Sequence, residues 1–249
     1  MNPCSRVSLV TGAGSGVGRA VVLKLAAEGW SVALAGRRPQ LLTETIALAG
    51  PAAAPRLAAF PCDVGDPVAV KMLHDATLAC FGRVDAVVAA AGSNTPRRSW
   101  NELTAENYHA LLAANLHSAF YCVQAFLPGM RQRATGTFIF INSEAGLRAS
   151  SKSGVAYIAA KFGLTGLAQS LNAEEHVHGI RACSIFPGDI NTPLLDQRPY
   201  PPPAELRARM LQPDDVAACV WLALNLPPRA SIEELVLRPS HCAALYPSG

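Results

Sequence analysis

Short apolar runs alternate along the chain with longer segments in which apolar residues recur at helical spacing. Short runs rich in Val, Ile, Leu and Ala are typical of buried strands, and the longer segments are typical of helices. The first helical segment ends at about Glu28, where Gly29 supplies a stop signal. The predicted strands cover residues 7–10, 32–35, 57–60, 84–90, 137–141, 181–186 and 232–237.

The predicted strands are continuously apolar, as in Ala-Val-Val-Ala-Ala at residues 86–90. Such strands are expected where helices cover both faces of a parallel sheet. The intervening segments are long enough for crossover helices, whereas a TIM barrel needs an eighth strand–helix unit. The pattern therefore predicts an α/β fold: a single-domain, Rossmann-type doubly wound sheet of about seven parallel strands with helices on both faces.

No linker or internal repeat divides the 249 residues, so we predict one domain over residues 1–249. Inside it, Arg-Pro-Tyr-Pro-Pro-Pro at residues 198–203 is too rich in proline to lie inside a helix. This stretch predicts an ordered loop or lid, or a surface connection.

Composition and charge exclude several classes of protein. Hydrophobic residues make up 50% of the chain and charged residues 16%, which is typical of a globular domain. The formal charge of +3 is too small to predict nucleic-acid binding, and no apolar stretch approaches the roughly 20 residues of a membrane span. No signal-peptide core follows Met1, so we expect a cytoplasmic protein without a membrane partner.

The cysteines and histidines do not predict a disulfide framework or a metal site. Seven cysteines are scattered and never spaced as C-x-x-C, which favours reduced thiols. His176 and His178 are two positions apart, so they point away from each other on a helix. The cysteines are Cys4, Cys62, Cys80, Cys122, Cys183, Cys219 and Cys242.

A glycine-rich turn follows the first predicted strand and opens the first helix. The glycines follow the pattern G-x-x-x-G-x-G through Gly12, Gly16 and Gly18, with Ser15 and Val17 between them. Backbone N–H groups at a helix start, together with the helix dipole, favour a pyrophosphate. The turn therefore predicts binding of a dinucleotide.

The residues after the second and third strands bear on which dinucleotide is bound. An enzyme that uses NAD commonly places an acidic residue after the second strand, but Arg37 and Arg38 lie there instead. Two guanidinium groups can bind a 2′-phosphate, so NADP(H) is favoured, although an exposed arginine pair and NAD(H) remain alternatives. Asp63 after the third strand is predicted to accept a hydrogen bond from the adenine amino group, to cap the next helix, or both.

Tyr157 and Lys161 lie four positions apart in a predicted helix over residues 154–169, so they share a face. A phenol with a pKa of about 10 is a poor acid–base catalyst at neutral pH. An ammonium group about 4 Å away would favour the phenolate by up to about 4 kcal/mol. The pair therefore predicts proton transfer between Tyr157 and an alcohol or carbonyl oxygen.

Taken together, these motifs resemble the short-chain dehydrogenase/reductase family over nearly the whole chain. The resemblance implies that Ser143 binds the substrate oxygen, Tyr157 is the general acid–base, and Lys161 holds the nicotinamide ribose and lowers the Tyr157 pKa. It also implies a proton-relay water at Asn115 and a homo-oligomer, usually a tetramer and otherwise a dimer, built through helices near residues 109–130 and 155–175. The residues that carry the resemblance are Thr11, Gly12, Gly16, Val17, Gly18, Asp63, Val64, Asn115, Ser143, Tyr157, Lys161, Pro187, Gly188 and Thr192. Pro187, Gly188, Ile190 and Thr192 would flank the nicotinamide carboxamide.

Three positions depart from the family pattern. The family often has Asn-Asn-Ala-Gly where this chain has Ala-Ala-Ala-Gly at 89–92, so Ala90 and Gly92 would contribute backbone alone. The family serine usually precedes the tyrosine by about thirteen positions, where Glu144 lies here. Ser143 fits the Ser-x-x-Gly pattern best, with Ser150, Ser151 and Ser153 as alternatives. Ser15 replaces a basic residue found in many NADP-preferring relatives.

The resemblance predicts an oxidoreductase that transfers a hydride between NADP(H) and a small alcohol or carbonyl compound. The alternatives are an NAD(H)-dependent enzyme, a dehydratase or epimerase on the same site, and a non-catalytic regulatory protein that binds a dinucleotide. The substrate pocket is predicted between residues 94–100 and a substrate loop at about 192–212, which includes Leu194, Leu195 and Tyr200. We expect this loop to become ordered over a bound ligand.

Overall fold

The sheet has seven strands, all parallel. A computed structural model of the chain describes residues 6–240, so the predictions for residues 1–5, Cys4 and Cys242 lie outside the described part. The strands are β1 (Val7–Thr11), β2 (Ser31–Gly36), β3 (Leu57–Pro61), β4 (Ala86–Ala89), β5 (Gly136–Ile141), β6 (Ile180–Pro187) and β7 (Glu234–Leu237). Their spatial order is β3-β2-β1-β4-β5-β6-β7, which confirms the predicted Rossmann-type sheet.

The strand order reverses direction between β1 and β4. From β1 the chain builds outward through β2 to β3, then returns to place β4 on the other side of β1. In an open parallel sheet, ligands bind at the carboxyl ends of the strands beside such a reversal. The topology therefore places the candidate site beyond Thr11 and Ala89.

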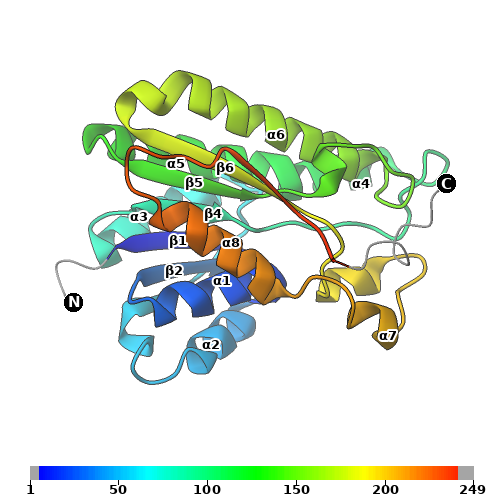
Figure 1. Cartoon of the computed structure of the whole chain (residues 1–249), viewed down its shortest axis with the longest axis horizontal. Coiled ribbons are helices and arrows are strands. Elements are labelled where there is room, and N and C mark those ends of the chain that lie inside the picture. Colours follow the sequence, from blue (N-terminus) through cyan, green and yellow to red (C-terminus); the bar gives the residue numbers. More distant parts are fainter. Residues whose placement is uncertain (1–5, 241–249) are drawn as a thin grey trace.

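Helices cover both faces of the sheet (Figure 1). Residues of α1, α2 and α8 pack against one face, and residues of α3, α5 and α6 pack against the other. The helices are α1 (Gly16–Ala27), α2 (Pro39–Leu48), α3 (Pro67–Phe81), α4 (Ala105–Leu112), α5 (Ser118–Gln132), α6 (Val155–Glu175), α7 (Ala204–Arg207) and α8 (Pro213–Asn225). Short helical turns are η1 (Ala54–Arg56), η2 (Ala113–His117), η3 (Glu144–Gly146), η4 (His176–His178) and η5 (Pro193–Gln197).

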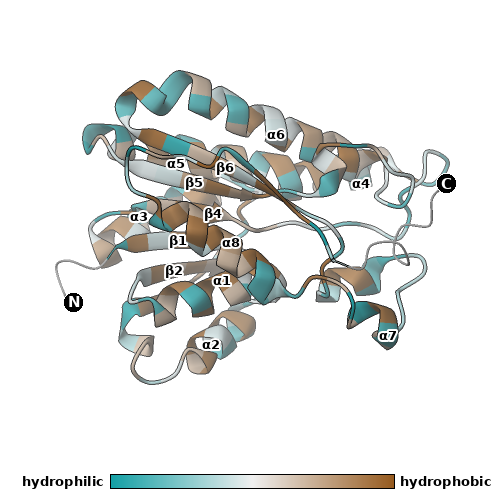
Figure 2. Ribbon diagram, viewed as in Figure 1, coloured by the Kyte–Doolittle hydropathy of each residue, from teal (hydrophilic) through white to brown (hydrophobic). Residues whose placement is uncertain are grey.

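The two helical layers explain why the inner strands are apolar at every position. In β5, Ile139 packs toward the α1 and α8 side, whereas Phe138 and Phe140 pack toward the α5 and α6 side. Successive residues of a strand face opposite sides, so a strand covered on both sides needs apolar residues throughout. In Figure 2 the inner strands are largely hydrophobic, whereas the helices on either side of them contain both hydrophobic and hydrophilic residues.

Some element boundaries differ from the predicted ones. Strand β4 ends at Ala89 rather than Ala90, because the amides of Ala90 and Ala91 donate to the Thr11 side-chain hydroxyl at 3.1 and 3.0 Å instead of to a backbone carbonyl of the neighbouring strand. Helix α6 continues past residue 169 to Glu175, and the left-handed Gly179 ends the η4 turn that follows. No proline or glycine lies between residue 169 and Glu175, so the sequence contains no signal that would end the helix earlier.

The stretch from α4 through η2 to α5 forms one long helix, Ala105–Gln132. By length and hydropathy it is the one helix within residues 6–240 that could cross a membrane. Its buried residues, which include Cys122, Phe126 and Met130, pack into the core on the same face of the sheet as α3 and α6. Since 39% of its apolar window is buried in the chain, this packing accounts for part of the apolar composition of the helix.

Candidate active site

Two adjoining cavities open at the carboxyl edge of the sheet. The first, which we call the turn cavity, has a volume of about 250 Å³ and is bordered by the glycine-rich turn. The second, the loop cavity, has a volume of about 450 Å³ and lies beneath the loops after β5 and β6. The two cavities share a wall formed by Asn142, Tyr157, Ile190, Thr192 and Leu194.

Every residue that the sequence predicts to be catalytic or to bind the cofactor lines one of these cavities. Residues predicted to bind a dinucleotide lie mainly in the turn cavity, and Ser143 lies in the loop cavity. The turn cavity is lined by Gly12, Ser15, Gly16, Val17, Arg37, Arg38, Asp63, Val64, Ala90, Gly92, Asn115 and Lys161. The loop cavity is lined by Ser143, Pro187 and Gly188, while Tyr157, Ile190 and Thr192 line both.

The glycine-rich turn brings the chain close to β4 and leaves helix α1 open at its start. Gly12 has φ +65° and Gly16 has φ +51°, a region that favours glycine. A Cβ on Gly12 would lie 2.8 Å from the Ala90 carbonyl oxygen. Ser15 is the N-cap of α1 but its side chain makes no cap bond, so the first amides of the helix face the cavity without that partner. This arrangement fits the pyrophosphate of a dinucleotide.

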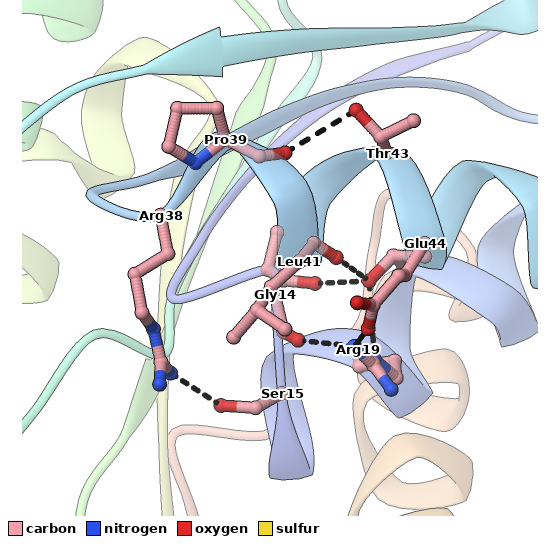
Figure 3. A network of polar contacts seen from close by, with 10 residues as sticks. Gly14, Ser15, Arg19, Arg38, Pro39, Leu41, Thr43 and Glu44 are labelled. Atoms are coloured by element: carbon pink, nitrogen blue, oxygen red, sulfur yellow. Dashed lines mark hydrogen bonds and ion pairs between the residues drawn. The ribbon is translucent and has the colours of Figure 1, made fainter.

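The arginines after β2 lie at the entrance of the turn cavity. Arg37 and Arg38 are both exposed, and the Arg38 guanidinium donates to the Ser15 hydroxyl at 3.4 Å (Figure 3). The Arg38 guanidinium thus places a positive charge beside Ser15. The glycine-rich turn has no basic residue of its own at this position. Arg19 has a different role. Its guanidinium donates to the Gly14 carbonyl oxygen at 2.6 Å and thereby stabilises the glycine-rich turn.

The two alternatives for Asp63 are now partly resolved. The Asp63 carboxylate lines the turn cavity and accepts from the Gly65 amide at 3.0 Å. The predicted helix cap at Asp63 is wrong, because Asp66 is the N-cap of α3 and accepts from the Val68 amide at 2.9 Å. Asp63 therefore shapes the turn before the helix, and its contact with adenine stays a prediction.

Asn115 lies in a π-helical turn, η2, inside the long helix. The side-chain nitrogen of Asn115, Nδ2, donates to the carbonyl oxygens of Ser93 and Leu111, both at 2.9 Å. Its side-chain oxygen accepts from the Ser93 backbone amide at 3.2 Å. Asn115 thereby fixes the loop after β4, where Gly92 leaves room for its side chain. Its predicted part in a proton relay stays a prediction.

Ser143 and Tyr157 meet at the wall between the cavities. Ser143 follows β5, and its backbone amide donates to the Asn142 side chain at 3.0 Å. The Ser143 hydroxyl lies beside the Tyr157 hydroxyl and lowers its pKa. Ser150 and Ser153 also line the loop cavity, but Ser143 is the serine that contacts the phenol, as its strand-end position predicts.

Lys161 lies one helical turn beyond Tyr157 and is 3% exposed. Its ammonium group donates to the Ile141 carbonyl oxygen at 2.8 Å and lies 5.5 Å from the centroid of the Tyr157 ring. The protein itself does not produce the predicted lowering of the Tyr157 pKa. Burial raises that pKa, and Ser143, Arg198 and Arg98 oppose the rise rather than Lys161.

Comparison with known proteins identifies this arrangement. The family model described as short chain dehydrogenase matches residues 6–200. The chain belongs to the short-chain dehydrogenase/reductase family. An uncharacterised oxidoreductase of Staphylococcus aureus is 30% identical to it over 234 residues, which cover 94% of this chain and 97% of that relative.

Solved structures of this family share the fold. An alcohol dehydrogenase from Thermococcus sibiricus in complex with 5-hydroxy-NADP is similar with a TM-score of 0.85 and 27% identity, over 95% of this chain and 97% of that one. A metagenomic short-chain oxidoreductase in complex with NADP is similar with a TM-score of 0.82 and 29% identity, over 96% and 100%. This member of the short-chain dehydrogenase/reductase family is accordingly an oxidoreductase.

The glycine turn of this short-chain dehydrogenase yields a prediction at Gly18. A Cβ on Gly18 would overlap the Gly12 carbonyl oxygen, so Gly18→Ala must displace the turn. We expect a loss of about 1–3 kcal/mol in unfolding free energy, measured by urea denaturation, together with weaker NADPH binding. Gly166→Ala in α6 is the matched control, because a Cβ there meets nothing within 4 Å and should stabilise the helix. Equal effects of the two substitutions would contradict the prediction.

A second prediction concerns Lys161, whose pKa burial lowers to about 8. Between about pH 8 and the unfolded value of 10.5, the unfolded chain binds more protons, so the unfolding free energy rises with pH. We expect the wild type to gain up to about 3 kcal/mol relative to Lys161→Met across this window. Urea denaturation of both proteins at several pH values measures the difference, and a difference that is independent of pH would contradict the assignment.

Part of each predicted pocket segment lines the loop cavity. Asn94, Arg98, Leu194 and Leu195 line the cavity as expected. Trp100 and Tyr200 do not line it, and they are 83% and 90% exposed. Both belong to the predicted pocket segments, but each side chain lies outside the cavity.

Backbone hydrogen bonds join the two ends of the segment that follows Thr192. The Asn191 amide donates to the Leu211 carbonyl and the Leu211 amide to the Asp189 carbonyl, at 2.8 and 3.1 Å. The predicted loop at residues 192–212 thus has paired ends, and it contains the short helices η5 and α7. Its ordering over a bound ligand stays a prediction.

Sequence reasoning did not select Asn142 and Asp189 as site residues. Asn142 is 3% exposed, contacts both cavities, and donates to the Thr165 hydroxyl at 3.0 Å. Asp189 lies in the loop after β6 and pairs with Lys152 and Arg198. The position of Asn142, directly before Ser143 at the end of a central strand, is the signal that could have identified it.

Proposed function

We propose that this protein transfers a hydride between NADP(H) and a small alcohol or carbonyl compound. The observation that carries the proposal is the position of Tyr157 in the wall between the two cavities, with its hydroxyl beside that of Ser143. A dinucleotide in the turn cavity and a substrate in the loop cavity would then meet at this phenol. The bound dinucleotide would supply the hydride.

The side chains at the junction handle the proton. Ser143 would hold the substrate oxygen beside Tyr157. In reduction Tyr157 gives its proton to the carbonyl oxygen, and in oxidation it accepts the hydroxyl proton. Burial raises the Tyr157 pKa and favours the proton-donating form, while Arg198 and Arg98 favour the phenolate. Lys161, held by the Ile141 carbonyl, would bind the nicotinamide ribose.

Three observations support NADP(H) as the dinucleotide. Arg37 and Arg38 are exposed at the turn cavity, and Arg38 contacts Ser15 of the glycine turn. The residue after β2 is Arg37 rather than an acid that would bind a ribose 2′-hydroxyl. Two structural relatives carry NADP or a derivative of it.

One experiment tests the proposed function as a whole. NADPH and NADH are titrated separately by fluorescence, and aldehydes, ketones and oxo-acyl compounds are then screened for consumption of the reduced dinucleotide. We expect tighter binding of NADPH and turnover of at least one carbonyl compound. Binding without turnover across a broad panel would favour a regulatory protein, and tighter binding of NADH would contradict the cofactor assignment.

We also propose that the protein forms a homo-oligomer. Phe120 on α5 and Phe162 on α6 are 44% and 45% exposed, and both helices are the ones through which the family resemblance predicts assembly. Large apolar side chains at exposed positions of neighbouring helices favour burial against another subunit. Light scattering of the eluting protein measures the mass, and a monomer would contradict the proposal.

A further inference from the structure

The side chains that line the loop cavity have the same net charge as the whole chain. Its lining contains five cationic side chains and two carboxylates, a surplus of three positive charges. The whole chain has a formal charge of +3, so the remainder of the molecule is balanced. The cations are Arg98, Arg148, Lys152, Arg198 and Arg238, and the carboxylates are Glu144 and Asp189.

Both carboxylates are already neutralised by neighbouring cations. Asp189 accepts from Arg198 at 2.5 Å and from Lys152 at 3.2 Å, and Glu144 pairs with Arg238. Burial disfavours the ionised form of Asp189, but Arg198 and Lys152 outweigh it and hold the pKa of that carboxyl below its ordinary value. The two acids therefore leave the positive surplus of the cavity intact.

Arg98 supplies a buried positive charge without a carboxylate. It is 7% exposed, and its guanidinium donates to the carbonyl oxygens of Thr95, Lys152 and Gln197 at 2.7, 3.2 and 2.8 Å. No carboxylate of residues 6–240 forms an ion pair with it. Carbonyl oxygens satisfy its N–H groups but do not cancel its charge, and a buried unpaired cation is costly. An anion in the cavity would offset that cost.

Arg148 supplies a cation that a ligand can contact directly. It follows the η3 turn that begins after Ser143, and its side chain is exposed at the cavity. Within the described part of the chain, its guanidinium makes no ion pair or hydrogen bond. The cavity is also lined by apolar side chains, which include Leu147, Leu194 and Leu195. These side chains can contact the carbon chain of a substrate.

We propose that the substrate is an alcohol or carbonyl compound that carries a carboxylate or phosphate group, and that Arg148 binds this anionic group. The reacting oxygen lies at Ser143 and Tyr157, and the anion lies in the positive field of Arg98 and its neighbours. This inference rests on the proposed function and names the class of substrate for the same site.

Matched pairs of compounds that differ in charge test the inference. With NADPH as the reductant, kcat/KM is measured for acetoacetate against methyl acetoacetate and for levulinate against methyl levulinate. Dihydroxyacetone phosphate against dihydroxyacetone distinguishes a phosphate from a carboxylate preference. We expect kcat/KM to be higher for at least one anion than for its neutral partner by roughly tenfold or more, mainly through KM.

Variants then assign the preference to Arg148. Arg148→Gln should reduce the anion-to-neutral ratio of kcat/KM by roughly tenfold, and Arg148→Lys should retain part of it. Arg229→Gln is the control, because Arg229 is exposed and lines neither cavity. A preference that survives Arg148→Gln unchanged would overturn the assignment to this residue.

A binding measurement separates failure of this inference from failure of the proposed function. Calorimetric titration of levulinate and methyl levulinate into the protein saturated with NADP⁺ measures affinity without turnover. If the dinucleotide does not bind, the proposed function fails. If it binds and neutral compounds bind or react as well as the anions in every pair, the proposed function stands and the anionic substrate is refuted.

Discussion

Tyr157→Phe is expected to lower kcat for carbonyl reduction by about a thousandfold. The substitution removes only the hydroxyl that contacts Ser143 at the wall between the two cavities. Without it, the developing oxyanion of the substrate loses its general acid at the junction. The affinity for NADPH should change little, because the turn cavity keeps its glycine turn, its arginines and Lys161. Consumption of NADPH at saturating substrate and fluorescence titration measure the two effects.

Tyr108→Phe is the matched control for this prediction. It also removes one phenol hydroxyl, but Tyr108 lies on α4 and lines neither cavity. Its kcat should equal that of the wild type. A Tyr157→Phe variant that retains full activity would refute the proposed mechanism, and one that no longer binds NADPH would indicate a structural role instead.

The sequence was sufficient to predict the fold and the general location of the site. Continuous apolar strands such as β5 require two covering layers of helices, and the helix lengths between strands require a parallel sheet. Parallel strands place their carboxyl ends together, so Thr11, Ser143 and Pro187 had to approach one another although they are far apart in the chain. Spacing alone placed Tyr157 and Lys161 on one face of α6.

The sequence did not predict contacts that depend on how separate loops meet. Arg98 is one of two adjacent arginines in a polar loop, and its role depends on carbonyl oxygens from residues 95, 152 and 197. No local pattern encodes that meeting point. For the same reason the electrostatics of Tyr157 differ from the predicted picture, because its burial and the approach of Arg198 are consequences of tertiary packing.

Replacing both Arg37 and Arg38 by Gln is expected to raise the dissociation constant of NADPH by about a hundredfold. Hydrogen bonds to charged groups are worth about 1.5–3 kcal/mol each, and exposure of both arginines places the pair at the lower end of that range. The dissociation constant of NADH should change little, because NADH has no 2′-phosphate. Fluorescence titrations of both dinucleotides with the wild type and the double variant measure the effect.

The dependence on salt separates a phosphate contact from a general loss of binding. Because the proposed contact joins exposed charges, the preference of the wild type for NADPH should weaken as ionic strength rises, whereas that of the double variant should not. Arg209→Gln is the control, since Arg209 is exposed and lines neither cavity. If the double variant still prefers NADPH as strongly as the wild type, another group binds the 2′-phosphate. If both dinucleotides lose affinity equally, the arginines support the glycine turn and do not select the cofactor.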